Sequence, residues 1–435
     1  MSEEITKTVE LVSLRLNAGK AEALSYVYKT YGEILKEAVD IMQYKGITSW
    51  VKGIKELYRY FRQKYPDLPA NYVQQAIRDA ASRLKSFQKL KEKGLAYTEK
   101  PEVKQWTVSC GNKLWKLSFQ GVEISTHAGW IRIPLLFHKQ FYILYNSGWT
   151  LRSSCRWKIE DRKLRLYVFF RKTVEPNTNY SKVIGIDVNE NNVTLFTLPD
   201  HKAITLVTNH SKIVLGYAYR RKAIQERHAH SLRSLRVALR KLRERNVKKA
   251  LRDKVASLIA KIAKKENAIL ILEKLPKRFQ EKVLKKSGLK SFDAHRLKQS
   301  AIRGIQNRIV EKALEYGVKV EFVDPKNTSR TCPRCGSSLN LMTGNAQRRG
   351  WKPRVLKCSK CGFTHDRDVI AAWNIAKKLD VSLMPWGSKG AHDPYVEWQV
   401  VTVNRKVEAQ HPSLDGWQGK ATFDYVKKVL AIEQS

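Results

Sequence analysis

The spacing of apolar residues over the first 175 positions predicts strands separated by a block of helices. Apolar and polar residues alternate within 5–16, the pattern of a strand with one buried face. Helical spacing runs through 20–44, 47–65 and 71–94, and alternation returns over 103–175. This order predicts a β-barrel or sandwich that is interrupted by a helical insert.

After Pro176, short apolar strands alternate with helices. The expected strands are 183–188, 193–198, 203–207, 268–273 and 318–323. The expected helices are 218–265, 294–316 and 368–378. This alternation predicts a second unit built on a packed sheet.

Three acids stand where these strands end or a helix begins. Asp187 and Glu273 each end an apolar strand, and Asp368 opens the last helix. Side chains at strand ends can converge on a ligand, and Mg²⁺ prefers carboxylate oxygens. Two Mg²⁺ ions held in this way can bind the attacking and leaving oxygens of a phosphodiester.

Each acid also has a purely structural interpretation. Asp187 suits a turn at a strand end, and Glu273 suits a solvated position paired with Lys274. Asp368 suits a helix N-terminus, where Asp366 is its rival. The conjunction of three such acids in a strongly basic chain favours a catalytic metal site.

The charge of the chain narrows the class of its partners. Of 435 residues, 82 are Lys or Arg and 40 are Asp or Glu, a net charge of +42. Such an excess of positive charge favours nucleic acid as the partner. The alternatives are a basic surface that only aids solubility and a peripheral membrane protein. From residue 380 onward there are six basic and seven acidic residues, so the tail does not contribute to the excess of positive charge.

The excess is concentrated in one predicted helical stretch. Between Arg220 and Lys254 there are fourteen basic and three acidic residues. Such a run is usually a solvated helix face, but this imbalance favours a helix lying along a phosphate backbone. The candidate contacts are Arg220, Arg221, Arg227, Arg233, Arg236, Arg240 and Arg243.

Four of the six cysteines form two CxxC pairs, which are Cys332, Cys335, Cys358 and Cys361. Two such turns complete a tetrahedron around a structural Zn²⁺. A redox pair is the alternative, but the βαβ context it needs is absent. The 22 residues between the pairs hold candidates for gripping single-stranded nucleic acid, namely Arg348, Arg349, Trp351, Lys352 and Arg354.

The length suggests about three domains. The longest apolar runs are too short to span a membrane, and the acidic N-terminus lacks the apolar core of a signal peptide. These features predict a soluble intracellular protein with no membrane partner.

Three stretches resemble the TnpB family of transposon-encoded RNA-guided DNA endonucleases, which are related to compact type V CRISPR effectors. They are Gly185-Ile-Asp187-Val-Asn, Leu272-Glu273-Lys-Leu, and the cysteine region continued by Gly-Phe-Thr-His-Asp-Arg-Asp368-Val-Ile-Ala-Ala-Trp-Asn374. The resemblance is strong from about 182 to 378 and only architectural before that.

The resemblance implies a multidomain α+β and α/β fold. Its parts would be a wedge β-barrel at 1–19 and 101–180, a helical recognition insert at 20–100, an RNase H-like RuvC nuclease domain at 181–327 and 365–379, a zinc-binding insert at 328–364, and a loosely ordered tail at 380–435. Within that tail, the stretch after Tyr395 has the pattern of a strand.

The resemblance also implies the activity. Asp187, Glu273 and Asp368 would bind two Mg²⁺ ions, with Mn²⁺ as a substitute. The family's spacing to the Ala-Ala pair selects Asp368 over Asp366. The pair Val369-Ile370 departs from the family, where more polar residues are common.

The partners implied are nucleic acids. A guide RNA, from the transposon end or a CRISPR-like locus, would pair with double-stranded target DNA beside a short adjacent motif. The helix at 71–94 would approach that motif, with Gln74 as a candidate base contact. The protein would lie in a prokaryotic cytoplasm, associated with the nucleoid when bound to DNA.

Two other functions fit parts of the sequence. A non-cleaving RNA-guided DNA binder would be expected to lack one of the metal-binding acids, and all three are present. A guide-independent RNase H-like nuclease, such as a resolvase or transposase, would not need the whole region before Lys182. Transposon-associated and CRISPR-associated members differ in genomic neighbourhood rather than in these residues.

Overall fold

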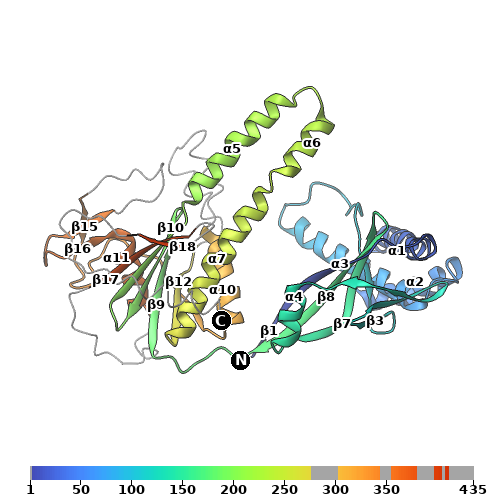
Figure 1. Ribbon diagram of the computed structural model, residues 1–435, viewed down its shortest axis with the longest axis horizontal. Helices are drawn as coiled ribbons and strands as arrows, with labels where there is room; N and C mark the ends of the chain where they lie inside the picture. Colours follow the sequence, from blue (N-terminus) through green and yellow to red (C-terminus); the bar gives the residue numbers. More distant parts are fainter. Residues whose placement is uncertain (1, 276–301, 343–353, 380–395, 404–406, 411–435) are drawn as a thin grey trace. The chain divides into compact units, whose positions relative to one another are not determined.

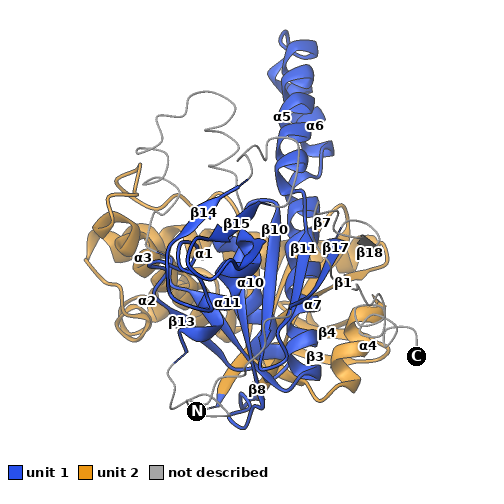
Figure 2. Ribbon diagram, turned by 90° about the vertical axis from the view of Figure 1, so that its left-hand side faces the viewer, with its two compact units in different colours: residues 1–2, 174–435 blue, residues 3–173 orange. Residues whose placement is uncertain are grey.

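The computed structural model describes residues 2–275, 302–342, 354–379, 396–403 and 407–410. They form two compact units with separate hydrophobic cores. Unit 2 comprises 3–173, and unit 1 comprises 174–435 with the first two residues (Figures 1 and 2). None of the helices in the described ranges is both long and apolar enough to cross a membrane.

Unit 2 is built from two sheets and four helices. Its strands are β1 (Glu3–Ser13), β2 (Val108–Cys110), β3 (Trp115–Ser118), β4 (Gly121–Thr126), β5 (Gly129–Ile133), β6 (Leu135–Leu136), β7 (Thr150–Glu160) and β8 (Lys163–Val174). Its helices are α1 (Ala18–Tyr44), α2 (Trp50–Lys64), α3 (Ala70–Glu92) and α4 (Lys139–Asn146). The three helices expected between the first strand and the later ones are thus present.

The β-barrel expected in this region is absent from residues 3–173. The strands form an open sheet in the order β2-β7-β8-β1-β6 and a separate sheet in the order β3-β4-β5. A barrel closes only when its first and last strands pair. The edge strands β2 and β6 have three and two residues, too few for a closing ladder.

One hydrophobic core joins the helices of unit 2 to its sheets. Tyr31 of α1, Tyr72 of α3 and Trp157 of β7 are fully buried in it. Tyr31 Oη and Ser109 Oγ both donate to Asp79 Oδ2 at 2.8 Å, so these buried polar groups are satisfied.

Unit 1 is built on a mixed sheet in the order β13-β12-β9-β10-β11-β17-β18. The strands are β9 (Lys182–Val188), β10 (Asn192–Leu198), β11 (Lys202–Val207), β12 (Ala268–Glu273), β13 (Val320–Val323), β17 (Glu397–Val403) and β18 (Val407–Gln410). Strands β9, β10 and β11 are antiparallel, whereas β12 is parallel to β9 and β17 is parallel to β11. A smaller sheet contains β14 (Leu339–Leu341), β15 (Val355–Cys358) and β16 (Thr364–Asp366).

Helices cover both faces of the large sheet. On one face, α7 (Glu244–Lys265) and α10 (Ile302–Glu315) pack against Ile184 and Ile186 of β9. On the other face, α11 (Arg367–Lys377) packs against Val183. Strands buried on both faces explain the continuous apolar runs in the sequence.

Strand β9 and helix α11 touch backbone to backbone at Gly185. A Cβ at this position would lie 2.2 Å from the carbonyl oxygen of Ala372 and 2.5 Å from the amide nitrogen of Ala376. Only glycine allows this approach, so Gly185 sets how closely α11 lies on the sheet.

The helical stretch expected over 218–265 is divided into three helices. Helices α5 (His210–Arg227) and α6 (Leu232–Lys241) form a hairpin, and α7 follows α6 (Figure 1). Arg243, at the junction, has a left-handed φ of 52°, which interrupts a right-handed helix. Every residue of α6 is at least partly exposed.

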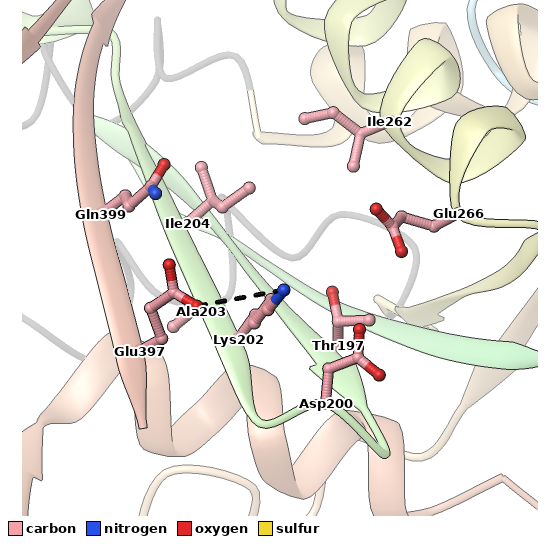
Figure 3. A pocket seen from close by; sticks show the side chains of 9 residues that line it. All are labelled: Thr197, Asp200, Lys202, Ala203, Ile204, Ile262, Glu266, Glu397 and Gln399. Atoms are coloured by element: carbon pink, nitrogen blue, oxygen red, sulfur yellow. Dashed lines mark ion pairs between the residues drawn. The ribbon is translucent and has the colours of Figure 1, made fainter. Parts of the chain in front are cut away.

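The described part of the C-terminal tail contributes two strands to the sheet. Strand β17 pairs with β11 along a parallel ladder from Lys202–Glu397 to Val207–Thr402. Trp398 is fully buried against α11 and the sheet. Lys202 Nζ and Glu397 Oε2 also form an ion pair at 4.0 Å, beside a small pocket that both strands line (Figure 3).

We expect Gly185→Ala to lower the free energy of unfolding by about 1–3 kcal/mol, because the opposing atoms belong to a helix backbone. Gly216→Ala in α5 is the matched control. A Cβ at Gly216 meets nothing within 4 Å, so alanine should stabilise the helix by roughly 0.5–1 kcal/mol. Urea denaturation followed by circular dichroism measures both, and two variants of equal stability would contradict the packing at Gly185.

Candidate functional site

Three elements of unit 1 bring together the acids Asp187, Glu273 and Asp368. Strand β12 runs parallel to β9 with Leu272 opposite Ile186, so Glu273 falls beside Asp187 on the next strand. By alternation, both carboxylates lie on the face that α11 covers. Asp368 is the second residue of α11, whose position on β9 is fixed at the backbone contact described above.

The charges of Asp368 and Glu273 act on Asp187. Burial raises the pKa of Asp187 well above its usual range, and the charges of Asp368 and Glu273 raise it further. Burial also raises the pKa of Glu273, against a hydrogen bond from Thr328 and the charge of Lys378. Acids that resist ionisation in this way are held in the ionised form by a divalent cation.

Asn189, in the turn after β9, and Asn192, the first residue of β10, contact two of these acids. Asn189 Nδ2 donates to Asp187 Oδ2 at 2.6 Å, and Asn192 Nδ2 donates to Asp368 Oδ2 at 2.9 Å. Sequence reasoning did not select either residue. The signal was the group of three asparagines within the five residues after Asp187, because amide side chains at a strand end can reach its carboxylates.

Arg354 forms an ion pair with Asp368, and the two side chains are 15% and 2% exposed. From the sequence, Arg354 was expected to contact nucleic acid, but its guanidinium instead pairs with the buried carboxylate of Asp368. The other residues of that group, which are Arg348, Arg349, Trp351 and Lys352, lie outside the described residues.

Asp366, the alternative to Asp368 as a metal ligand, instead stabilises the N-terminus of α11. Its Oδ1 accepts hydrogen bonds from the backbone N of Asp368 at 2.9 Å and of Val369 at 3.3 Å. Its Oδ2 accepts from the backbone N of Arg354 at 2.7 Å. Burial and the neighbouring Asp368 raise the pKa of Asp366 to about 7. Asp366 therefore caps α11 and leaves Asp368 to the acid cluster.

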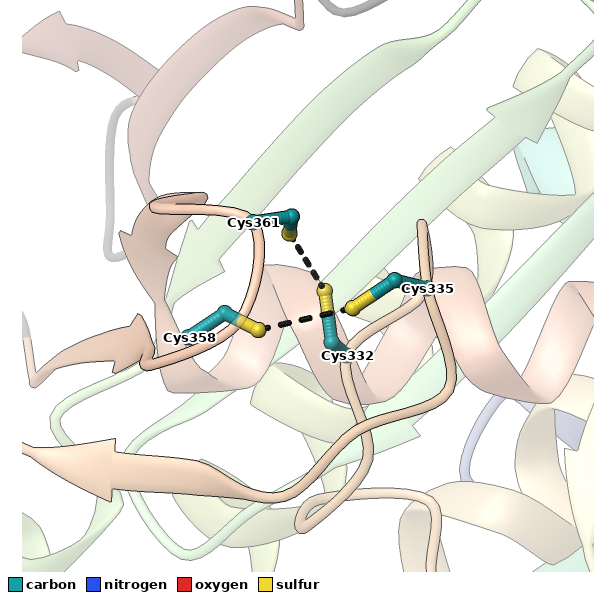
Figure 4. A group of neighbouring side chains, drawn as sticks. All are labelled: Cys332, Cys335, Cys358 and Cys361. Carbon is teal, nitrogen blue, oxygen red and sulfur yellow. Dashed lines mark hydrogen bonds between the residues drawn. The ribbon is translucent and has the colours of Figure 1, made fainter.

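The four cysteines, Cys332, Cys335, Cys358 and Cys361, form one cluster (Figure 4). Their Sγ atoms all lie within 4.8 Å of one another, the spacing that a single metal ion requires. Hydrogen bonding by Ser337 lowers the pKa of Cys335 to about 6, which favours the thiolate that binds metal.

The two cysteine turns have matching geometry. The backbone N of Gly336 donates to the carbonyl of Cys332, and that of Gly362 donates to the carbonyl of Cys358. The two glycines have φ of 74° and 70°, a left-handed conformation that glycine adopts without strain. Each turn therefore directs two thiols to the same point.

A polar bridge links the cysteine cluster to Glu273. Asn374 Nδ2 donates to the carbonyls of Thr328 at 2.7 Å and Thr331 at 2.8 Å, in the segment that leads into Cys332. Thr328 Oγ1 in turn donates to Glu273 Oε1 at 2.7 Å. An ion that fixes the cysteine turns would therefore also restrain one member of the acid cluster.

The arginines selected on the helical hairpin differ in exposure. The exposed ones are Arg220, Arg227, Arg233, Arg236, Arg240 and Arg243. Arg221 is partly buried and forms an ion pair with Glu244, so it has a structural role. Gln74, on α3 of unit 2, is partly buried.

Three family models match separate parts of the chain. The RuvC nuclease domain matches 170–296, and the Cas12f1-like TNB domain matches 303–375. The third, an uncharacterised family named after MJ0013, matches 27–125. The first match contains Asp187 and Glu273, and the second contains Asp368 and the four cysteines.

A TnpB-like protein of Methanocaldococcus jannaschii is 30% identical over 225 residues, which are 50% of this chain and 76% of that protein. The CRISPR-associated endodeoxyribonuclease Cas12f1 of an uncultured archaeon is 38% identical over 72 residues, 17% of this chain and 13% of its own. Cas12f1 solved with sgRNA and target DNA is 16% identical, with a TM-score of 0.56 over 86% of this chain and 99% of its own, which shows a shared fold. Because the first of these similarities extends over three quarters of the relative, we conclude that the chain belongs to the TnpB-like family.

Proposed function

We propose that this protein is an RNA-guided DNA endonuclease that hydrolyses DNA phosphodiesters in a single RuvC site. The observation that carries the proposal is the convergence of Asp187, Glu273 and Asp368 in the region that the nuclease-domain models match. Convergent carboxylates in a strongly basic chain suit metal-assisted phosphodiester cleavage better than a binding role.

The donor chemistry of the acid cluster fits two Mg²⁺ ions, for which Mn²⁺ can substitute. Its ligand atoms are hard oxygens. Burial raises the pKa of Asp187, and the charges of Asp368 and Glu273 raise it further, so a cation bound beside these acids would stabilise their ionised forms. Asp187, Glu273 and Asp368 would hold the ions, which stabilise charge on the attacking and leaving oxygens when bound.

The rest of the site would keep these carboxylates in position. Asn189 contacts one oxygen of Asp187, and Asn192 and Arg354 contact the two oxygens of Asp368. Arg354 places positive charge beside Asp368, which favours the approach of a phosphate. Ligand residues held by such partners need little rearrangement when a substrate binds.

We assign a structural Zn²⁺ to the four cysteines. A site of four thiolates is closed, with no position left for substrate, so the ion would stabilise the fold rather than react. Through the bridge from Asn374 and Thr328, this ion would also steady Glu273.

The partners we propose are a guide RNA and double-stranded DNA, bound in the prokaryotic cytoplasm. A net charge of +42 suits a duplex held by its backbone while base pairing reads the sequence. Cas12f1, whose fold the chain shares, was solved with sgRNA and target DNA, and this supports the same roles here. Unit 2 would carry the wedge sheets and, at 20–100, the recognition helices, with Gln74 near the motif beside the target.

We expect Asp187→Ala to slow cleavage by about three orders of magnitude or more, because several kcal/mol of charge stabilisation are lost. Retention of RNA should stay nearly unchanged, because the acid faces the metal site and not the exposed arginines. Mg²⁺-dependent cleavage of a plasmid target and RNA filter binding measure the two effects. Asp67→Ala, at an exposed acid, is the control, and cleavage that survives in Asp187→Ala would overturn the metal-site assignment.

The hairpin arginines should contact phosphates. We expect the triple replacement of Arg233, Arg236 and Arg240 by Gln to weaken the salt dependence of nucleic-acid binding. The slope of the logarithm of the association constant against the logarithm of the salt concentration should become shallower by about two to three. Arg221→Gln is the matched control, because Arg221 pairs with Glu244 and its loss should leave the slope unchanged. An identical slope in the triple variant and the wild type would show that the hairpin does not lie on the nucleic acid.

Cys358→Ser should release the metal of the cysteine cluster. We expect about one zinc per chain in the wild type and nearly none in the variant, measured by plasma mass spectrometry after gel filtration. Cys155→Ser, at a buried cysteine of unit 2, should keep its zinc. Equal metal content in the two variants would contradict the four-thiolate site.

A further inference from the structure

A chain of buried hydrogen bonds runs from the C-terminal tail to the acid cluster. Trp398 Nε1 of β17 donates to Thr205 Oγ1 at 3.0 Å, and Thr205 Oγ1 lies 3.1 Å from Thr194 Oγ1. Asn192 Nδ2 donates to Thr194 Oγ1 at 3.2 Å and to Asp368 Oδ2 at 2.9 Å. Each of the five residues is at most 1% exposed.

The register of the sheet explains why these side chains meet. Thr194 of β10 lies opposite both Asp187 of β9 and Thr205 of β11. The two threonines therefore continue a row of side chains across the sheet that begins with Asp187 on β9. Strand β17 lies beside β11 in the sheet (Figure 2). From β17, Trp398 Nε1 reaches Thr205 Oγ1 on β11.

The orientation of Asn192 depends on this chain. Its Oδ1 has no hydrogen-bond partner among the described residues, so its amide is oriented through its two N–H groups. One N–H points to Asp368 and the other to Thr194. If the Thr194 hydroxyl turned away, Asn192 would keep a single anchor and its amide could rotate away from the carboxylate.

Trp398 also contacts the segment that leads into α11. The rings of Trp398 and His365 lie 5.3 Å apart, and His365 directly precedes Asp366, the cap of α11. His365 Nδ1 accepts from the backbone N of Asp366 at 2.8 Å. The tail strand is therefore linked to Asp368 in two ways, through the hydrogen-bond chain that begins at Thr205 and through His365 at the start of α11.

We propose that Trp398 is a positioning residue for Asp368, acting through Thr205, Thr194 and Asn192, and that β17 of the tail completes the nuclease core. The inference rests on the proposed metal-dependent function of the acid cluster. The proposal gives β17 a role in catalysis, although no residue of β17 belongs to the acid cluster.

Substitutions at Thr205 test the chain at its middle. Thr205→Val removes the hydroxyl at nearly constant volume, and it should lower the single-turnover cleavage rate about threefold to tenfold with target binding unchanged. Thr205→Ser keeps the hydroxyl and should restore most of the rate. Thr402→Val makes the same change on the same face of β17, outside the chain, and should cleave like the wild type. Equal rates for Thr205→Val and Thr402→Val would overturn the proposal.

Substitution of Trp398 tests whether the two residues act on one path. Trp398→Phe keeps an aromatic ring but removes the N–H, and should lower the rate about as much as Thr205→Val. The double variant should be no slower than the slower single variant, because one chain is broken in either case. Rates that multiply in the double variant would show two independent packing defects and contradict the chain.

Binding of Mn²⁺ alone gives a readout that needs neither guide RNA nor cleavage. Calorimetry should show a Mn²⁺ site in the wild type that Asp187→Ala loses, with affinity about threefold to tenfold weaker in Thr205→Val. If the wild type has no such site, the proposed metal-dependent function fails and the inference fails with it. If the wild type binds and Thr205→Val binds and cleaves equally well, only the positioning role of Trp398 is wrong.

Discussion

The contact of two backbones at Gly185 is the constraint on which the acid cluster depends. Helix α11 lies so close to β9 that no side chain fits between them at this position. This closeness brings Asp368, from late in the chain, to the strand that carries Asp187. The parallel pairing of β12 with β9 then adds Glu273. The glycine two residues before the first acid thus acts on the chemistry through packing alone.

Placing three acids together has an electrostatic cost, and the surrounding residues limit it. Arg354 and Asn192 both contact Asp368, Asn189 contacts Asp187, and Thr328 contacts Glu273. These partners come from the β9–β10 turn, from the start of β10 and from the cysteine-rich insert. The nuclease unit and the cysteine cluster are therefore parts of one polar network, although their residues are far apart in sequence. The exposed arginines of α5 and α6 lie apart from this network, free to meet a polyanion.

The sequence located the clustered acids and thiols more reliably than it predicted the architecture around them. Strand ends, the cysteine spacing and the long motif around Asp368 identify the acids and the thiols, because these features are local. The barrel prediction was wrong because alternation reveals a strand but not its neighbours, and the edge strands β2 and β6 are too short to close the sheet on itself. The break at Arg243 depends on one left-handed residue that carries no sequence signal. Sequence reasoning did not select Asn192, Thr205 or Trp398. The bonds from Asn192 to Asp368 and from Trp398 to Thr205 span 176 and 193 positions, and only the fold brings these residues together.

The central claim is that an RNA directs this nuclease, and the RNA itself tests it most directly. The protein would be purified from cells that carry its native locus, and the bound RNA would be sequenced. The account predicts one discrete RNA with a constant scaffold and a variable end, and changing that end should redirect Mg²⁺-dependent cleavage to the matching DNA. Heterogeneous RNA, or cleavage that ignores the variable end, would contradict the account and favour a guide-independent nuclease.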